Sequence, residues 1–467
     1  MNLPLDPATL LSAFASAFTQ NNRLLKLRFS PSADIAENTL LPWQLSGHEA
    51  INDGFKYQIT CLSPDTYIEL KHLIGQPIEI SLLTDSGDYR PLSGWVTDAK
   101  QEGADGGMAR YTLTFQDLFA LLKLRTNNRI FQETNSRDAV LTILHEHQTN
   151  PILADSLDID DRTSRDYPTQ ALISQLHESD ADFCKRKLAD EGISYYFDYG
   201  DTNAERPTIT LVLFDDNSQL PDNPAGDVRY HRSDATEDRD SITEWHNQRS
   251  LVSGAVYRAS PDYKPVNIDQ QQDTSRLDQG ETGNALSASL EDYRYTSPHY
   301  GKDSADHARY TELRMQAHEY AGKQFSGSGS VRAFTIGRFT LADHPEIDQH
   351  DAIDREFILT QLTLTAVNNL PDGLGSGKQG AGSGELALTR GLPLPTPRSL
   401  LTSTSRYRCH TRRVDGLFNR FAALMLAGDC ARIDCCCDAV CRAQSFGGFE
   451  CLFFISRAAV VIGGAGL

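Results

Sequence analysis

Alternation of apolar and polar residues constrains the fold of this chain more than any other sequence feature. The runs 78–82 and 111–115 place apolar side chains at every second position, and Gly and Asp turn residues separate them. The run 23–29, RLLKLRF, reads as a further strand. A period of two in runs that are separated by turn residues is typical of antiparallel β-structure. We therefore expect a small β-barrel or sandwich over residues 23–130, preceded by a short helix or tail at 1–22.

The same period returns later in the chain. The runs TITLVLFD, ITEWHNQRSLVSGAVYRAS, RAFTIGRFTLADHPEID and REFILTQLTLTAVNNL all carry strand patterns. They predict a second β-barrel, with insertions, over residues 201–370. Within it, residues 264–292 are polar and are expected to form a long loop or an edge hairpin, and a helix is expected over 304–323. The fold class is thus α+β and predominantly β.

Helical signals concentrate between the two β regions, where residues 131–200 are predicted to form an α/β insertion. Asn135 or Ser136 can cap a first helix, which would bury Ala139, Val140, Ile143 and Leu144. A second helix is expected from an N-cap at Thr169 to a left-handed C-cap at Gly192. Its predicted apolar stripe consists of Leu172, Ile173, Leu176, Phe183 and Leu188. A strand with alternating Ile193, Tyr195 and Phe197 follows.

The second helix also carries five carboxylates, Glu178, Asp180, Asp182, Asp190 and Glu191. Asp182 lies three and four residues before Lys185 and Arg186, a spacing that gives exposed pairs worth roughly 0.2–0.5 kcal/mol each. We interpret these charges as a solvated helix face. The alternative is a cell-wall hydrolase that uses Glu178 and Asp182 as a carboxylate pair, which would require the two groups to face each other across a cleft.

Charge and composition exclude several classes of function. The chain has 63 acidic against 44 basic residues and a net charge of −19, which disfavours nucleic acid as a partner because phosphate contacts need clustered Lys and Arg. Asp6 precedes the apolar stretch 10–18 where a secretory signal would carry a base, so no Sec signal is expected. The longest apolar run near the end is interrupted by Arg457, so no transmembrane helix is expected either.

The remaining motifs do not predict a cofactor or metal site. GSGKQG at 375–380 has the spaced glycines of a nucleotide loop, but it is flanked by linker instead of a strand and a helix. His145 and His147 are two apart and would point to different sides of a helix, which is not zinc-site geometry. Neither Cys61 nor Cys184 has a sequence context that predicts an activated thiol.

The composition changes abruptly after a Gly- and Pro-rich linker at 371–397. Residues 398–467 contain nine Arg, no Lys and five acids, together with seven of the nine cysteines. Their spacing does not match a zinc ribbon or finger, although zinc binding stays open as an alternative. We interpret this Arg- and Cys-rich segment as an out-of-frame product without a native fold of its own.

The order of these pieces resembles a known family. GQPIEISL, RPLSGWVTDAKQEG, NNRIFQE, the block from ESDADF to EGISYYF, FTLADHP and LTLTAVNNLP together are similar to VgrG, the spike protein family of bacterial type VI secretion. More distantly they are similar to the tail hub of contractile phages. The resemblance covers roughly residues 20–395. It implies a homotrimeric hub of two related β-barrel domains with α/β insertions, which presents a pseudo-sixfold ring to the hexameric tube of Hcp proteins.

What the resemblance further implies is a structural, non-enzymatic role with no catalytic, cofactor or metal residues. The implied partners are the chain's own copies, Hcp, baseplate components and effectors. Such a protein is assembled in the bacterial cytoplasm and secreted on firing. Family members continue into an oligonucleotide-fold barrel and a Val/Gly-rich needle, which this sequence lacks, so a PAAR-type tip protein has no needle to sit on. A prophage baseplate hub is the closest alternative.

Overall fold

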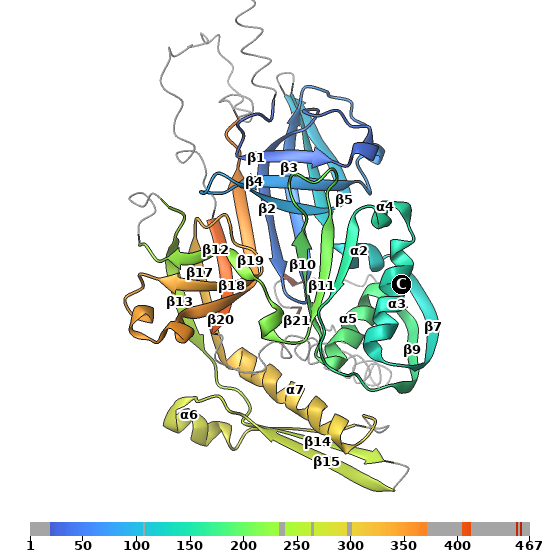
Figure 1. Cartoon of the computed structure of the whole chain (residues 1–467), viewed down its shortest axis with the longest axis vertical. Helices are drawn as coiled ribbons and strands as arrows, with labels where there is room; N and C mark the ends of the chain where they lie inside the picture. The colour runs from blue at the N-terminus through green and yellow to red at the C-terminus, as the bar shows by residue number, and fades with distance from the viewer. Residues whose placement is uncertain are drawn as a thin grey trace, which may run out of the picture.

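The structure is a computed structural model that describes residues 19–105, 108–232, 239–262, 266–296, 301–370 and 404–411, and the short strands at 454–455 and 458–459. The predicted N-terminal helix, the linker with its GSGKQG motif and the cysteine-rich tail lie wholly or largely outside these residues. Figure 1 shows three parts: a large sheet at the top and left, an α/β region at the right, and a thin lower layer crossed by a long helix.

The first part of the large sheet is antiparallel, in the order β1-β4-β5-β6-β3-β2. Its strands follow the period-two runs, and both faces of β4 are buried. Two short 3-10 helices, Pro31–Ala33 and Leu70–His72, lie in its connections. The strands are β1 (Leu25–Phe29), β2 (Leu41–Ala50), β3 (Gly54–Ser63), β4 (Pro77–Leu83), β5 (Tyr89–Asp105) and β6 (Met108–Gln116).

The sheet then continues without a break into strands from the second half of the chain. β2 pairs antiparallel with β19, and the order runs on through β20 and β17 to β13, while β18 pairs with β19 and, in parallel, with β12. These strands are β12 (Asp222–Arg229), β13 (Ile242–Arg249), β17 (Lys323–Gly329), β18 (Gly337–Ala342), β19 (Glu356–Val367) and β20 (Thr404–Thr411).

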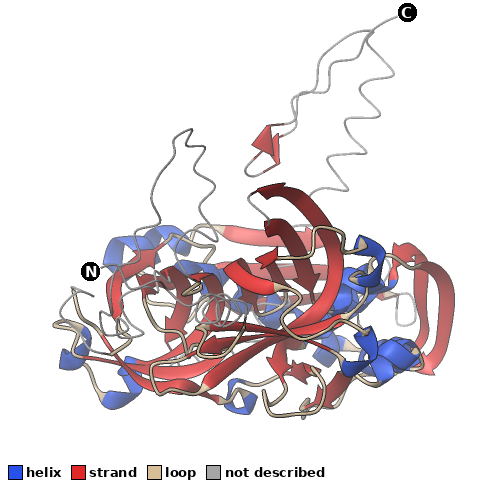
Figure 2. Ribbon diagram, turned by 90° about the horizontal axis from the view of Figure 1, so that it is seen from above, coloured by secondary structure: helices blue, strands red, loops and turns tan. Residues whose placement is uncertain are grey.

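The predominantly β class with few helices is therefore confirmed, but the strand pairing is not that of two separate barrels. Ten of the twelve strands form one path from β1 to β13, with β18 and β12 branching from β19, and no pairing among the described strands closes the path. Viewed from above, the strands curve through the molecule with helices at its periphery (Figure 2). The predicted domain boundaries remain a prediction.

The α/β region packs against the first part of the sheet. Strands β7 and β9 form one small antiparallel sheet, and β10-β11-β8 form another, in which β11 and β8 are parallel. Its elements are α2 (Leu118–Leu122), β7 (Thr126–Thr134), α3 (Ser136–Gln148), α4 (Pro151–Ala154), β8 (Leu157–Asp161), β9 (Gln170–Ser179), α5 (Asp180–Glu191), β10 (Ser194–Tyr199) and β11 (Ile209–Phe214).

The sequence located α3 correctly but placed the start of α5 too early. Asn135 caps α3 by accepting a hydrogen bond from the Asp138 N–H, and the four predicted apolar residues are buried. The helix predicted from Thr169 is instead strand β9 up to residue 179, and only then does α5 begin. Ser179 is the cap, and Leu172 and Leu176 are exposed strand residues instead of a helical stripe. The predicted C-cap at Gly192 is confirmed, with a left-handed φ of 71°.

The lower layer is a three-stranded sheet, ordered β15-β14-β16, with helix α7 along one face. The helix predicted over 304–323 is confirmed as α7 (Ser304–Gly322), capped by Asp303. Of the residues 264–292, expected to form a long loop or an edge hairpin, 267–274 form the edge strand β15, which pairs with β14, and the sequence missed the helix and strand that follow. The elements are β14 (Ala255–Asp262), β15 (Asn267–Thr274), α6 (Gly280–Ser287) and β16 (Glu291–Tyr295).

Further 3-10 turns cover residues 217–219, 347–349 and 352–355, and a two-residue pair links β21 (Phe454–Ile455) to β22 (Ala458–Ala459).

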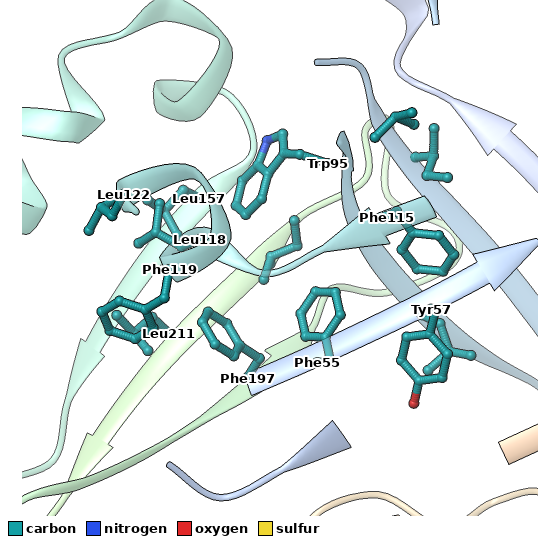
Figure 3. Packing of buried hydrophobic residues seen from close by; sticks show 14 of the residues in the cluster. Phe55, Tyr57, Trp95, Phe115, Leu118, Phe119, Leu122, Leu157, Phe197 and Leu211 are labelled. Carbon is teal, nitrogen blue, oxygen red and sulfur yellow. The ribbon is translucent and has the colours of Figure 1, made fainter. Parts of the chain in front are cut away.

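The largest apolar core joins the first part of the sheet to the α/β region. Figure 3 shows its aromatic centre, where Phe55 of β3 meets Phe197 of β10 edge to face with ring centroids 5.4 Å apart. Trp95 is buried in the same cluster and donates a hydrogen bond from Nε1 to Ser156 Oγ at 3.1 Å. Because these contacts come from both regions, the α/β region and the first part of the sheet share one core. Among the described residues, no helix combines the length and apolarity needed to cross a bilayer.

Candidate functional site

The carboxylate-rich block 178–191 holds the candidate catalytic residues that the sequence offers. The structure gives each member of the predicted hydrolase pair its own partner. Glu178, at the end of β9, pairs with the Arg186 guanidinium, whose Nε lies 3.1 Å from Oε2. Asp182, in the first turn of α5, accepts a hydrogen bond from Ser179 Oγ at 2.6 Å. This arrangement favours a capping and pairing role over acid–base chemistry.

Other charges of this block are buried, which corrects the prediction of a solvated helix face. Asp180 has no exposed side-chain surface and lies 2.9 Å from Arg125 Nε and 2.9 Å from His147 Nε2. Gln175 Nε2 donates to its other oxygen at 2.7 Å. The predicted pairs of Asp182 with Lys185 and Arg186 are also not formed, since Arg186 binds Glu178. The cluster instead joins β7, α3, β9 and α5.

The two histidines flagged in the sequence separate, as expected from their spacing. His147 contacts Asp180, whereas His145 Nδ1 lies 3.0 Å from Gln148 Oε1. Within the described part of the chain, no three His, Cys, Asp or Glu side chains gather as metal ligands. Cys61 and Cys184 are free and buried, and burial raises the pKa of both thiols well above its usual value. Thiolate chemistry at either residue is therefore disfavoured.

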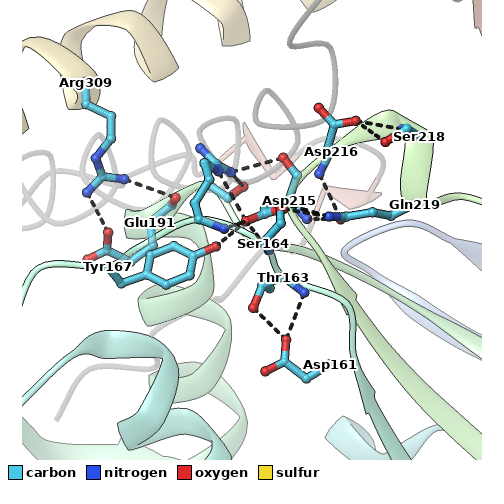
Figure 4. A network of polar contacts seen from close by, with 12 residues as sticks. Asp161, Thr163, Ser164, Tyr167, Glu191, Asp215, Asp216, Ser218, Gln219 and Arg309 are labelled. Carbon is cyan, nitrogen blue, oxygen red and sulfur yellow. Dashed lines mark hydrogen bonds and ion pairs between the residues drawn. The ribbon is translucent and has the colours of Figure 1, made fainter.

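Glu191, at the end of α5, ties the α/β region to helix α7 (Figure 4). Its side chain is fully buried, and Arg309 of α7 donates from Nη2 to Oε2 at 2.7 Å. The Tyr310 hydroxyl and Ser136 Oγ donate to Oε1 at 3.2 and 3.1 Å. Next to it, Gly192 approaches α7 so closely that an added Cβ would lie 2.7 Å from Leu313 Cδ2. The junction therefore combines a buried ion pair with tight packing.

Asp215, after β11, is the centre of a second network in the same view (Figure 4). The backbone N–H groups of Ser164 and Arg165 donate to it at 3.0 and 2.9 Å, and the Tyr167 hydroxyl donates at 2.8 Å. Burial alone would raise the pKa of Asp215, but these hydrogen bonds and that of Gln219 lower it to about 2. A carboxylate with so many donors is a structural anchor for the 162–168 loop, not a base.

A further buried pair lies within the large sheet and is contacted by the α/β region. Arg90 of β5 donates from Nη2 to Glu49 Oε1 at 2.5 Å, and both side chains are about 95% buried. The Tyr199 hydroxyl of β10 donates to Glu49 Oε2 at 2.7 Å. Sequence reasoning missed all four networks, around Asp180, Glu191, Asp215 and Glu49, because their members lie far apart along the chain. The Ser-x-x-Asp spacing at 179–182 was the one local signal available, and it marks the true helix start.

Comparison with known families gives this arrangement a context. The family model described as "Phage tail baseplate hub (GPD)" matches residues 48–370, which include most of the large sheet and all of the networks above.

Among curated proteins, the chain is similar to the type VI secretion system spike protein VgrG1b of Pseudomonas aeruginosa, with 26% identity over 365 residues, 77% of this chain and 46% of that protein. It is also similar to VgrG4b of the same organism, with 28% identity over 69% of this chain and 38% of that protein. The chain thus spans about half the length, or less, of these relatives.

Solved structures show the same fold at low identity. The E. coli c3393 protein, described as a type VI secretion component with structural similarity to the phage T4 tail proteins gp27 and gp5, gives a TM-score of 0.53 at 16% identity, covering 84% of this chain and 78% of that chain. The tail protein of Neisseria meningitidis MC58 also gives 0.53, at 11% identity, covering 86% of this chain and 99% of that one. The predicted resemblance to the spike and hub family is confirmed.

Proposed function

Because the chain belongs to the phage tail baseplate hub family, we propose that it is a structural hub of a contractile injection apparatus of the type VI secretion kind. The observation that carries the proposal is the family match over residues 48–370, the span that holds most of the continuous sheet and its buried ion pairs. The role is mechanical, and no reaction is assigned to the chain. The curated relatives are themselves named as spike proteins.

The proposed assembly is a homotrimer in which the two parts of the large sheet act as two related barrel-like modules. Three subunits would then present six modules in a ring to a hexameric tube of Hcp proteins. Supporting this, the β2–β19 pairing joins the two parts of the sheet edge to edge in one continuous sheet. Obligate interfaces of such rings usually exceed about 2,000 Å².

The remaining partners follow from the same proposal. Baseplate components and effectors would bind the assembled hub, which would be built in the bacterial cytoplasm and leave the cell on firing. The function is that of a platform.

A baseplate hub of a prophage tail is the second candidate. It is favoured by one observation: the chain covers 99% of the Neisseria tail protein, against 78% of the c3393 protein, at equal TM-scores. The two candidates share the fold and differ in the tube that they bind.

Co-expression of the full chain with a type VI tube protein, followed by mass photometry and sizing, tests the proposal. We expect a trimer that retains tube hexamers, and a phage tail-tube protein in a parallel experiment distinguishes the second candidate. A stable monomer that binds neither tube would overturn the proposal. Hydrolysis of purified peptidoglycan by this material, lost on E178Q but not on E133Q, would instead support the hydrolase alternative.

A further inference from the structure

Among the described residues, the large apolar side chains that are exposed on strands form two separate groups. The first group, called here the ribbon face, consists of Ile130 of β7 with Leu172 and Leu176 of β9, which are 61, 55 and 62% exposed. The second group, called the lower face, consists of Ile268 of β15 with Tyr293 and Tyr295 of β16. None of the networks described above uses either face.

The ribbon face is the outer side of a strand pair whose inner side is packed in the core. Phe131 of β7 stacks on Phe183 of α5 with ring centroids 5.8 Å apart, which defines the covered side. Successive residues of a strand point to opposite sides, so Ile130 points away from α5. Leu172 and Leu176 are its diagonal neighbours across the pair, on the same open side. Strands with apolar residues on both sides are typical of strands that are buried on both sides.

The lower face belongs to a sheet that turns charged residues inward and aromatic residues outward. Asp269 of β15 contacts His307 of α7 at 3.2 Å, and Asp292 of β16 contacts His318 of α7 at 3.0 Å. Because side chains alternate along a strand, the neighbours of these aspartates that form the lower face point away from α7. A half-covered antiparallel sheet normally turns its apolar side to a core and its polar side to water. The reversed arrangement indicates that the lower face becomes covered in an assembly.

The two faces are chemically alike and lie on different parts of the subunit. On the strands that carry them, the exposed neighbours that share their side are the uncharged Asn128 and Gln132 of β7 and Gln270 and Gln272 of β15. The ribbon face lies on the strands at the right of Figure 1, and the lower face lies on the layer at the bottom. Such surfaces suit each other by apolar packing and offer little to a partner that is selected by charge.

Ring symmetry explains why one chain would carry two such faces. A threefold ring closes through a heterologous contact, in which one surface of each subunit meets a different surface of the next. One contact between the ribbon face and the lower face, repeated around the ring, would cover both faces on every subunit. A contact of either face with its own copy would make a twofold pair and leave the other face open.

We propose that the ribbon face of each subunit packs on the lower face of the next subunit in the ring. The inference rests on the proposed hub role, and it adds the two surfaces that close the trimer. Sheets that pack face to face lie about 10 Å apart with interdigitating side chains. The rings of Tyr293 and Tyr295 would therefore lie among the three aliphatic side chains of the ribbon face, and tyrosine is a residue that interfaces favour.

Charge rescue in the full chain tests the contact, with mass photometry to measure the concentration at which half of the subunits are assembled. L176K and Y293E should each raise that concentration about tenfold or more, because each buries an unpaired charge in the contact. The double variant L176K/Y293E places opposite charges in every contact and should recover most of the loss. L176K/Y293K places like charges there and should assemble no better than either single variant. The controls I74K and Y67E make comparable exchanges at exposed side chains outside both faces and should assemble normally.

Photo-crosslinking supplies an independent readout. With benzoylphenylalanine in place of Tyr293 and a mixture of isotope-labelled and unlabelled subunits, we expect crosslinks from one copy to segments 126–134 or 170–179 of another. The free energy of unfolding of the separated subunit, measured below the assembly concentration, should not change in the single variants, because these side chains are exposed within one copy. If L176K or Y293E fails to fold, I130K and Y295E repeat the test.

The outcomes separate this inference from the hub role. Trimers that both single variants leave unchanged, or crosslinks that reach only the lower face of another copy, would overturn the contact and leave the hub role standing. Variants that stay trimeric but no longer retain the co-expressed tube protein would assign the faces to the tube and overturn the contact as well. A monomeric parent chain would overturn both proposals.

Discussion

The α/β region and the lower layer are both attached to the large sheet, but they are held in different ways. The α/β region shares the largest apolar cluster with the sheet. By contrast, none of the three apolar clusters found among the described residues includes a residue of β14, β15 or β16. Within that layer Arg258 of β14 pairs with Asp292 of β16 at 2.7 Å, and Asp292 also contacts His318 of α7 at 3.0 Å.

The outer face of the lower layer is correspondingly open. Ile268, Tyr293 and Tyr295 are 55, 61 and 52% exposed. Apolar burial is roughly proportional to area and insensitive to salt, whereas ion pairs at a partly exposed site are weaker and screened. The comparison indicates that the core shared by the large sheet and the α/β region stabilises the fold, whereas the lower layer presents an exposed surface.

The largest effect is expected in the shared core. F115A removes a fully buried ring of β6 that stacks on Tyr57 with centroids 5.5 Å apart. It should lower the free energy of unfolding by about 3–5 kcal/mol, measured by chemical denaturation. The control Y67A removes a ring that is 89% exposed and should change little. Similar losses in both variants would mean that the core does not dominate stability.

A smaller and local effect is expected at the polar junction. R258M removes the guanidinium that links β14 to β16 through Asp292 and should destabilise the β14–β16 layer by about 1–3 kcal/mol. Hydrogen exchange should accelerate in these strands while the protection of β3 and β6 is unchanged. R294M, which removes an exposed guanidinium of β16 for which no ion pair is recorded among the described residues, is the matched control. Loss of protection throughout the sheet would show that the layer is not an independent unit.

The anchor of the 162–168 loop predicts a pH dependence. The pKa of Asp215 is about 2 in the folded protein, below the value near 3.9 of an unfolded chain. Its contribution to stability is therefore complete above about pH 4 and is lost as the pH falls toward 2. D215N should flatten the fall of unfolding free energy across that window relative to the parent chain. Parallel curves for the two proteins would show that Asp215 is not the group that titrates.

The smallest effect is expected on the open face. Y293S should change the free energy of unfolding by no more than about 0.5 kcal/mol, because the ring contributes little to any core. Denaturation of Y293S beside F115A would sharpen the contrast between the regions. A decrease in the free energy of unfolding of more than about 2 kcal/mol would show that the Tyr293 side chain is part of a packed core.

Local signals in the sequence predicted those elements whose stability is itself local. Asn135 and the apolar period located α3, and period-two runs located most strands. The start of α5 was missed because Leu172, Ile173 and Leu176 fit a helical stripe by chance, although β7 holds them in a strand. The buried carboxylates could not be predicted, since Glu191 meets Arg309 across 118 positions of the chain. No spacing rule reaches that far.

The seam between β1 and the end of β19 has a consequence for biosynthesis. Asn368 Oδ1 accepts the N–H groups of Leu24 and Leu25 at 3.0 Å, and Arg23 donates to the Asn369 carbonyl at 2.7 Å, a contact across 346 positions. Nearly the whole hub must therefore be synthesised before the segment around β1 can contact the end of β19. Until β19 pairs with it, the edge of β2 is unpaired and can pair with strands of other chains. Such aggregation is a risk for sheets that form slowly from distant segments. Nascent chains of this protein should be clients of chaperones that shield such edges.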